Sequence, residues 1–278
     1  MPSLILEGGT LRPIFTAGIL DALLDNNISF PYCIGVSAGI TNGVSYLSKQ
    51  KGRNLEIIMK YRNDKRYLGY GNFLKCKSLF GLDFVFDEIP NKLVPFDMDT
   101  YKKYPGKVLV GVTNAKTGET EYLDGKELDD KATLLRATCA IPIFFPVIKI
   151  NNNEYYDGGL CDPIPVRKAI EDGNKKHLII LTQPTGYRKE LSKKNVFVSK
   201  MLSNKYPNLK DAFLTRHENY NATVKFCEEL EKQGKAIILR PDYKLESFEK
   251  DTNKLQSNYQ HGYEMAIKHL DKIKSLFK

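Results

Sequence analysis

The first 47 residues alternate two short apolar runs with two helical patterns, and glycines follow each apolar run. The run "SLILEGG" (3–9) predicts a buried strand, and "PIFTAGILDALLDNN" (13–27) follows with apolar residues at helical spacing. "ISFPYCIGVSAG" (28–39) predicts a second strand, and a helix from Ala38 to about Leu47 comes next. This β-α-β-α order is typical of a mostly parallel sheet with helices on its faces.

The rest of the chain continues the α/β pattern, with no repeat and no linker long enough to separate two domains. We expect strands within 107–125, 141–150, 153–157, 177–184 and 235–241, and helices within 129–140, 163–173, 193–203, 206–233 and 252–276. Residues 49–105 are less regular, which predicts short helices and loops that form a lid or insertion. We therefore predict one domain over 1–278, with its core at about 3–183 and a helical C-terminal part at 184–278 that adds one strand.

The composition predicts a soluble protein of the cytoplasm. The five cysteines are scattered and form no C-x-x-C pair, so neither a zinc site nor a disulfide framework is expected. The N-terminus lacks the basic segment and long apolar core of a signal peptide, and no run approaches the ~20 apolar residues that span a bilayer. The sequence gives no indication of a metal ion or an organic cofactor, and the oligomeric state is left open.

Much of the formal charge of +9 is concentrated in one segment. Nine Lys or Arg residues stand against two acidic residues between Lys49 and Lys77, and aromatic residues are interleaved as far as Phe80. Basic and aromatic residues together suit an anionic membrane surface or phosphate-bearing head groups. A solvated face with a few core aromatics is an alternative of equal weight. No nucleic-acid-binding motif accompanies the charge, so nucleic acid is not expected as a partner.

Ser37 lies in "GVSAG" (35–39), between the second predicted strand and the helix that follows. Small residues on both sides of a serine allow the backbone to turn sharply and expose the hydroxyl. The helix that begins at Ala38 directs free N–H groups and its positive dipole end toward that oxygen. This pattern predicts a nucleophile, although a serine in a glycine-rich turn without a catalytic role also fits it.

Gly8, Gly9 and Thr10 end the first predicted strand and precede a helix. Glycines let main-chain N–H groups turn toward a ligand, so this loop can supply donors to a developing oxyanion. The sequence "GGTLRP" lacks the lysine of a P-loop and the spacing of a dinucleotide-binding fingerprint. A plain turn between strand and helix, without a binding role, remains the alternative.

The base that would activate Ser37 is the remaining question. Asp157 follows "NEYY" and precedes two glycines, and a carboxylate whose pKa is raised by burial can accept a hydroxyl proton. A hairpin turn also explains Asp-Gly at this position. The histidines fall in predicted helices or at the start of a strand without an evident catalytic partner: His177, His217, His261 and His269.

Three segments together resemble the patatin-like phospholipase family: "LILEGGTLRPIFTAGILDAL", "YCIGVSAGI" and "YYDGGLCDPIPVRKAI". That family has a glycine-rich oxyanion loop, a G-x-S-x-G nucleophile and a D-G-[GA] aspartate in this order. "LLRATCAIPIFFPV" also resembles the segment that precedes the aspartate, so the likeness spans about residues 3–183. The resemblance implies a three-layer α/β/α fold with a mostly parallel central sheet and a Ser-Asp dyad.

The resemblance assigns Ser37 as the nucleophile, Asp157 as the base, and the backbone of Gly8, Gly9 and Thr10 as oxyanion donors. Arg12 matches the basic position of the loop motif and supports it together with Ala38. Thr10 and Pro13 replace two glycines of the motif, and proline has no N–H to donate.

The implied activity is hydrolysis of fatty-acyl esters of phospholipids or lysophospholipids without a metal or cofactor, with 49–80 as a route to an anionic membrane surface. A protein that binds lipid or acyl groups with little or no hydrolysis is one alternative, because two positions of the glycine-rich loop are changed. A conventional Ser-His-Asp esterase is another.

Overall fold

The central feature of the fold is one mixed β-sheet. The computed structural model describes residues 1–69, 71–73 and 78–278. Eight strands form the sheet: β1 (Pro2–Leu6), β2 (Tyr32–Val36), β3 (Lys107–Asn114), β4 (Thr120–Asp124), β5 (Ile148–Ile150), β6 (Asn153–Asp157), β7 (Lys176–Ile180) and β8 (Ala236–Leu239). Their order is β5-β6-β3-β2-β1-β7-β8, and β4 also pairs with β3. The sheet is parallel from β3 to β8, whereas β4, β5 and β6 form an antiparallel extension.

The middle strands are apolar at nearly every position because helices cover both of their faces. All five residues of β2 are buried, as are four of the five in β1 and in β7. Alternate side chains of β1 enter different clusters: Leu4 and Leu6 belong to one core, and Ile5 to the other. The fold is therefore a three-layer α/β/α arrangement, as the sequence predicts.

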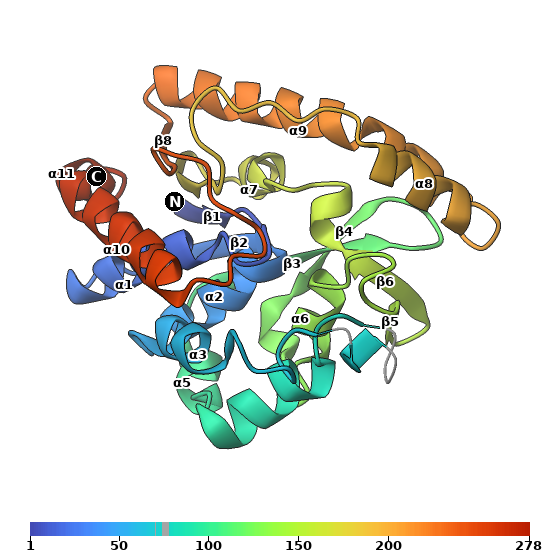
Figure 1. Ribbon diagram of the computed structural model, residues 1–278. Coiled ribbons are helices and arrows are strands. Elements are labelled where there is room, and N and C mark those ends of the chain that lie inside the picture. Colours follow the sequence, from blue (N-terminus) through green and yellow to red (C-terminus); the bar gives the residue numbers. More distant parts are fainter. Residues whose placement is uncertain (70, 74–77) are drawn as a thin grey trace.

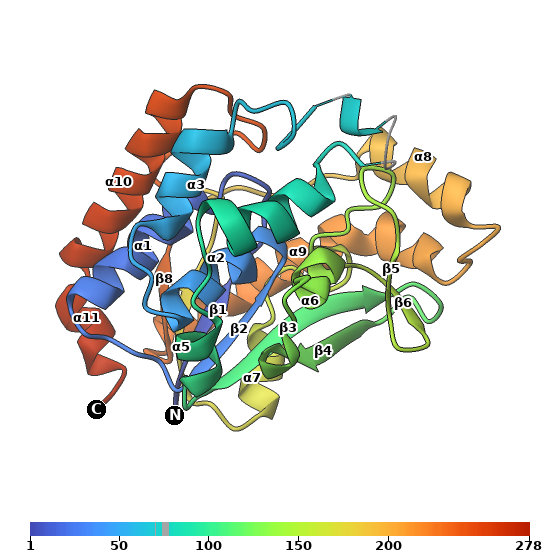
Figure 2. The ribbon, with the colours of Figure 1, turned by 90° about the horizontal axis from the view of Figure 1, so that it is seen from below.

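The helical segments differ greatly in length. They are α1 (Ile14–Asp25), α2 (Ser37–Leu47), α3 (Arg53–Tyr61), the π-helical η1 (Phe84–Leu93), α5 (Met98–Lys103), the short η2 (Gly125–Glu127), α6 (Thr133–Thr138), the short η3 (Gly158–Leu160), α7 (Val166–Glu171), α8 (Lys193–Leu202), α9 (Leu209–Lys232), α10 (Thr252–Lys268) and α11 (Leu270–Ser275). Helices α7 and α9 cover one face of the sheet, and α1, α2, α3 and α10 lie on the other (Figures 1 and 2). Among the described residues, no helix combines the length and apolar composition needed to cross a bilayer.

Helix α10 packs directly onto α1, although more than two hundred residues separate them in the chain (Figure 2). A Cβ on Gly18 would lie 1.9 Å from the carbonyl oxygen of Tyr259, and one on Gly262 would lie 2.0 Å from that of Phe15. Glycine is therefore required on both helices where their backbones meet. This contact holds α10 beside the helix that follows the Gly8–Thr10 loop.

The structure confirms the predicted elements except in two places. The apolar segment 141–150 contributes only Ile148–Ile150 to the sheet, so the prediction of a longer strand was wrong. Pro142 and Pro146 lack N–H groups and interrupt any ladder in this segment. The last predicted helix is divided at His269 into α10 and α11.

The irregular region 49–105 contains short helices, as predicted, and its action as a lid remains a prediction. The C-terminal part supplies one strand, β8, which pairs with β7. This pairing is compatible with the predicted single domain over 1–278, which also remains a prediction.

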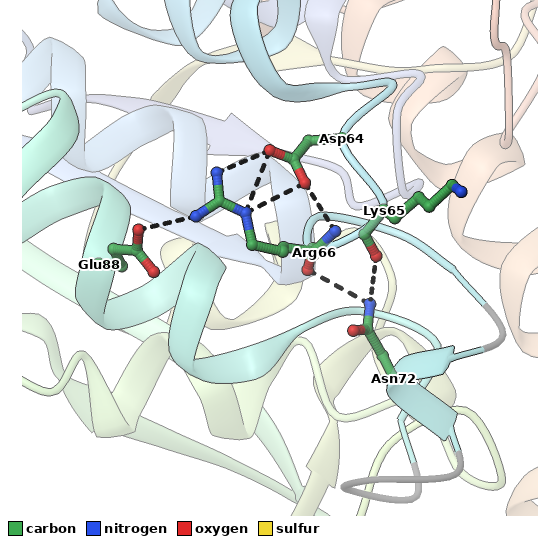
Figure 3. A network of polar contacts seen from close by, with 5 residues as sticks. All are labelled: Asp64, Lys65, Arg66, Asn72 and Glu88. Carbon is green, nitrogen blue, oxygen red and sulfur yellow. Dashed lines mark hydrogen bonds and ion pairs between the residues drawn. The ribbon is translucent and has the colours of Figure 1, made fainter.

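Most of the described basic residues of the segment 49–80 are either ion-paired or buried. Lys51, Lys60 and Arg66 form ion pairs with carboxylates, and Arg53 and Arg62 are buried. Figure 3 shows the Arg66 guanidinium held between Asp64 and Glu88, while Asn72 donates to the carbonyls of Lys65 and Arg66.

The aromatic residues of this segment divide between the interior and the surface. Tyr67 is buried and packs on Phe80, whereas Phe73 is exposed. Tyr70, Lys75 and Lys77 lie outside the described residues, so they are not placed. Membrane contact through 49–80 remains a prediction. Among the described residues of the segment, the exposed cations without a carboxylate partner are Lys49 and Lys65.

Candidate active site

The three glycine-marked turns of the sequence meet on one side of the sheet. The Gly8–Thr10 loop follows β1, and Ser37 follows the neighbouring strand β2. Asp157 arrives differently, because β6 is antiparallel to β3. Its register places Asp157 opposite Val112, one residue beyond the Gly111 that pairs with Val36 of β2. The hydroxyl and the carboxylate thus approach each other across β3.

Ser37 occupies a strained turn. It is the first residue of α2 and has a φ of 53°, a left-handed conformation that costs energy for a residue with a side chain. A Cβ on Gly39 would lie 2.4 Å from the Glu7 carbonyl oxygen, and one on Gly35 would lie 2.8 Å from the Leu6 Cβ. The glycines on either side of Ser37 are therefore needed for close packing of the turn against β1.

Asp157 is buried and hydrogen-bonded. Its Oδ1 accepts a 2.7 Å hydrogen bond from the Gly159 N–H, and Ser37 lines the same cavity as the carboxylate. Burial raises the pKa of Asp157, while the Ser37 side chain, the Gly159 N–H and the charges of Arg216 and Lys189 partly oppose the rise. A carboxylate with a raised pKa is a better proton acceptor than one in water.

The Gly8–Thr10 loop lies directly against Ser37. A Cβ on Gly8 would lie 2.8 Å from the Ser37 Cβ. Within the described chain, the N–H groups of Gly8, Gly9 and Thr10 have no hydrogen-bond acceptor, and neither does that of Ala38 in the first turn of α2. Free donors beside a nucleophile are what an oxyanion requires.

The two departures from the family's loop motif have different structural consequences. Thr10 adopts a φ of 59°, so a β-branched residue stands in a conformation that favours glycine. Pro13 immediately precedes α1, where its missing N–H costs little because the first turn of a helix leaves its donors unpaired. Of the two changes, the one at Thr10 is therefore the one that strains the loop backbone.

The Arg12 side chain packs against the Gly8–Thr10 loop. Its Nε donates to the Thr182 Oγ1 at 3.3 Å, and its Nη1 donates to the Ser247 hydroxyl. A Cβ on Gly9, where φ is 154°, would approach the Arg12 Nη2 to 2.8 Å. The guanidinium thus touches the loop backbone and joins it to the C-terminal part of the chain.

A cavity of about 330 Å³ opens above these groups. Its motif side consists of Gly8, Gly9, Thr10, Ser37 and Asp157, and its C-terminal side consists of Lys189, Lys194, Arg216, Ser247 and Phe248. Arg12 lines the same cavity. The structure therefore brings all the predicted site residues into this one cavity except Ala38, which lines the neighbouring cavity.

A second, apolar cavity leads away from Ser37. It has about 80 Å³ and is lined by Ala38, Phe80, Phe145 and other mainly apolar residues. It shares Thr41, Tyr67, Val85 and Phe86 with a larger cavity of about 230 Å³. The two cavities are therefore neighbours, and the one next to Ser37 is the smaller.

Sequence reasoning missed Thr138 and the residues of the C-terminal side. The Ser37 N–H donates to the Thr138 hydroxyl at 2.8 Å, and this hydroxyl donates to the Gly111 carbonyl at 2.6 Å. Thr138 thus connects the turn at Ser37 to β3. It lies in "LLRATCAIPIFFPV", the segment that carried part of the resemblance, but its residue type gave no separate signal.

The four histidines, all among the described residues, lie elsewhere. None lines the cavity that contains Ser37. His177 is buried in β7 at 2.8 Å from the Ser3 hydroxyl, and burial lowers its pKa to about 4. His217 is near Glu218, His261 stacks on Tyr243, and the His269 Nδ1 contacts the Met265 carbonyl. In the described part of the chain, no group of three or more His, Cys, Asp or Glu side chains is arranged to hold a metal ion.

Comparison with known families gives two matches along the chain. The patatin-like phospholipase model matches residues 4–170, which contain the loop, Ser37 and Asp157. The chain belongs to the patatin-like phospholipase family. A second model, a domain of unknown function (DUF6363), matches residues 206–278. In this patatin-like protein, Arg216, Ser247 and Phe248 of the cavity fall within that second region.

Two curated relatives share part of this patatin-like sequence. The uncharacterised protein YjjU of Escherichia coli is 28% identical over 197 residues, which cover 66% of this chain and 52% of YjjU. The probable lipid hydrolase 463L of Invertebrate iridescent virus 6 is 27% identical over 194 residues, which cover 63% of this chain and 65% of the viral protein. The chain thus spans between half and two-thirds of these relatives.

Among solved structures, VipD from Legionella pneumophila aligns with 97% of this chain and 66% of its own length. The TM-score is 0.47 and the sequence identity is 15%.

Proposed function

We propose that this protein is a serine acyl hydrolase that cleaves fatty-acyl ester bonds of phospholipids or lysophospholipids. The observation that carries the proposal is the meeting of Ser37 and the buried Asp157 in the lining of one cavity, with unpaired loop N–H groups alongside. No imidazole lines the cavity, so the carboxylate is the base that the geometry offers. The family and the viral relative's name, probable lipid hydrolase, support a lipid ester as the substrate.

Acylation begins when the Ser37 Oγ attacks the ester carbonyl carbon and Asp157 accepts the hydroxyl proton. The carbonyl oxygen becomes an oxyanion, which accepts hydrogen bonds from the N–H groups of Gly8, Gly9, Thr10 and Ala38. The tetrahedral intermediate then collapses. The bond to the alcohol breaks, and Asp157 returns its proton to the leaving alkoxide oxygen, which leaves the acyl group on Ser37.

Deacylation repeats these steps with water. Asp157 takes a proton from a water molecule whose oxygen attacks the acyl-enzyme carbonyl, and the same loop holds the second oxyanion. Collapse breaks the bond to the Ser37 Oγ, which regains the proton from Asp157. The products are a fatty acid and the enzyme in its starting state, so no cofactor takes part in the balance.

The apolar cavities give the acyl chain a place. The smaller cavity begins at Ser37, the larger one shares part of its lining, and aromatic and aliphatic side chains predominate in both. Burying a methylene group contributes roughly 0.8 kcal/mol, so a long chain gains considerably more binding energy than a short one. Esters with long acyl chains should therefore have lower KM values than acetate esters.

Two substitutions test the dyad. Ser37→Ala and Asp157→Asn should each lower kcat for a p-nitrophenyl acyl ester by at least about 10³-fold while the circular dichroism spectrum is retained. Ser203→Ala and Asp99→Asn, whose side chains lie outside the cavity, serve as matched controls and should behave like the unmodified protein. Full activity in either dyad variant would overturn the assignment.

A second candidate function is acyl or lipid binding without efficient hydrolysis. The strained φ of Thr10 favours it, because a distorted loop is a weaker oxyanion site. A fluorophosphonate probe separates the two candidates. An activated Ser37 becomes covalently labelled, whereas a serine in a passive binding pocket does not react.

A further inference from the structure

The cavity above Ser37 carries an excess of positive charge. Its lining contains four basic and two acidic residues: Arg12, Lys189, Lys194, Arg216, Glu7 and Asp157. Three of the four basic residues come from the C-terminal side, outside the segments that carry the family motifs. The charge therefore calls for an explanation beyond the proposed dyad.

The basic residues of this cavity have no carboxylate partner within ion-pair distance in the described part of the chain. Instead, the Arg216 Nε donates to the Gly159 carbonyl at 2.9 Å. The Lys189 Nζ lies 3.7 Å from the centre of the Tyr220 ring, and the Lys194 Nζ lies 3.8 Å from that of Phe144. Aromatic faces hold these lysines in place but leave their charge uncompensated.

Basic side chains elsewhere in the protein are held in two ways. Arg240 lies 3.1 Å from the Glu228 carboxylate, whereas the buried Arg53 and Arg62 have no carboxylate within ion-pair distance in the described part of the chain and donate to carbonyl oxygens. What distinguishes the cavity is therefore that four basic residues gather in one lining.

The cavity cations also repel one another. Burial lowers the pKa of Arg216, the Asp157 carboxylate partly opposes this fall, and the charge of Arg12 adds to it. Burial and the charge of Arg216 lower the pKa of Lys189. Holding like charges together in a partly dry space destabilises the free protein, and an anion that enters the cavity relieves this cost.

We propose that Lys189, Lys194 and Arg216 form a subsite for the phosphate group of an acyl-ester substrate. The inference rests on the proposed function and assigns the residues that bind the phosphate group of the proposed phospholipid or lysophospholipid substrate. Arg12, already part of the loop, faces the same space.

The position of Arg216 sets this spacing. Its Nε bonds to Gly159, the residue whose N–H holds the Asp157 carboxylate, so the guanidinium stands beside the proposed base. Its two Nη groups have no acceptor among the described residues and match the oxygens of a phosphate in geometry. A glycerol backbone, which separates ester and phosphate by a few bonds, suits a phosphate site in the same cavity as Ser37.

A pair of substrates that differ only in the phosphate tests the subsite. Monolauroylglycerol and monolauroylglycerol phosphate are compared in neutral detergent micelles, and kcat/KM is measured for each. The unmodified protein should prefer the phosphate ester. Arg216→Met, Lys189→Met and the surface-accessible Lys194→Met should each lower this preference, and the Arg216→Met/Lys189→Met pair should lower it by about 10–100-fold.

Lys193→Met is the matched control, because Lys193 precedes Lys194 in α8 but does not line the cavity. It should leave the preference unchanged. Arg216 and Lys189 also depress the pKa of Asp157, so their loss can slow both substrates through the base. Equal losses for both substrates, together with a shifted pH profile, would overturn the subsite.

A binding experiment separates this inference from the proposed hydrolysis. Calorimetry with glycerol phosphate and with inorganic phosphate is carried out on the Ser37→Ala protein, in which turnover is removed. Binding of glycerol phosphate that is lost on Arg216→Met supports the subsite even if no ester is hydrolysed. Arg216-dependent binding of inorganic phosphate without any preference between the two esters would overturn a substrate role and indicate a free-phosphate site.

Discussion

The two sides of the cavity were built by different means. On the motif side, backbone geometry dominates: a serine at a φ of 53°, glycines that no other residue can replace without a clash, and N–H groups left unpaired. On the C-terminal side, side-chain charge dominates, and the cations are held by aromatic rings and carbonyls. The motif side suits a reaction that is the same for many esters, whereas the C-terminal side suits the selection of one ester substrate over another.

This difference predicts how substitutions should divide. Changes on the motif side should lower kcat for every substrate, because they alter the reacting groups or the oxyanion donors. Changes on the C-terminal side should alter KM and substrate preference. The following experiments, from the largest expected effect to the smallest, either break this division or sharpen it.

Gly8→Ala should have the largest effect. The new Cβ would lie 2.8 Å from the Ser37 Cβ, so the loop must move away from the nucleophile. We expect kcat for a p-nitrophenyl ester to fall by about 10²–10³-fold, the usual cost of a lost oxyanion donor. Gly71→Ala is the control, because nothing lies within 4 Å of a Cβ there. A Gly8→Ala protein with normal kcat would mean that the loop does not contact the transition state.

Thr138→Val should have the next largest effect. It removes the hydroxyl that accepts from the Ser37 N–H and donates to Gly111, and so leaves two buried groups unpaired. We expect kcat to fall by roughly 10–100-fold and the free energy of unfolding to fall by about 1–3 kcal/mol. Thr138→Ser, which keeps the hydroxyl, should recover most of the loss. If both variants lose equally, the methyl group and not the hydrogen bonds would be responsible.

Arg62→Met probes the C-terminal side from outside the cavity. The buried Arg62 donates to the carbonyls of Phe248 and Glu249, at 3.0 Å and 2.6 Å, and so fixes the segment that closes this side. We expect KM for a phospholipid to rise by roughly 3–10-fold while the rate of fluorophosphonate labelling stays near normal. Lys60→Met, at an exposed position of the same segment, is the control. A fall in labelling rate as large as the rise in KM would contradict the division.

The smallest expected effect is the change that Asp157→Asn makes to the melting temperature. The raised pKa of Asp157 means that the folded protein binds this proton more tightly than the unfolded chain, so stability is lost as pH rises from about 4 through the folded pKa. At pH 7 the variant should therefore melt about 2–4 °C higher than the unmodified protein. Below pH 4 this difference should disappear. A lower melting temperature at pH 7 would show that the charged carboxylate stabilises the fold.

The sequence was sufficient for most of the fold and for the motif side of the site. Apolar strands that end in glycine, such as the one before Gly8-Gly9, constrain the backbone directly, so pattern and structure coincide. The prediction of a strand over 141–150 was wrong because Ile141 and Phe145 are apolar for another reason. They line the cavity next to Ser37 and do not join the sheet. The boundary between α10 and α11 at His269 has no glycine or proline next to it, so the sequence does not predict it.

The C-terminal side could not be predicted from local pattern. Lys189 lies in the loop between β7 and α8, and Arg216 lies in α9, which packs over β1 and β7. Only the tertiary fold brings both residues to Asp157. Thr138 was similarly hidden, since its hydroxyl acts through a hydrogen bond to a residue 101 positions away. Long-range convergence of single polar groups leaves no spacing that a reader of one sequence can detect.

The glycine contact between α1 and α10 bears on the order in which the protein matures during synthesis. A chain emerging from the ribosome exposes the Gly8–Thr10 loop and Ser37 first, yet the helix after that loop meets its partner only when Gly262 has been translated. A nascent chain that contains every motif residue would thus still lack the support of its first helix. Catalytic competence should arrive late and abruptly, once α10 has docked.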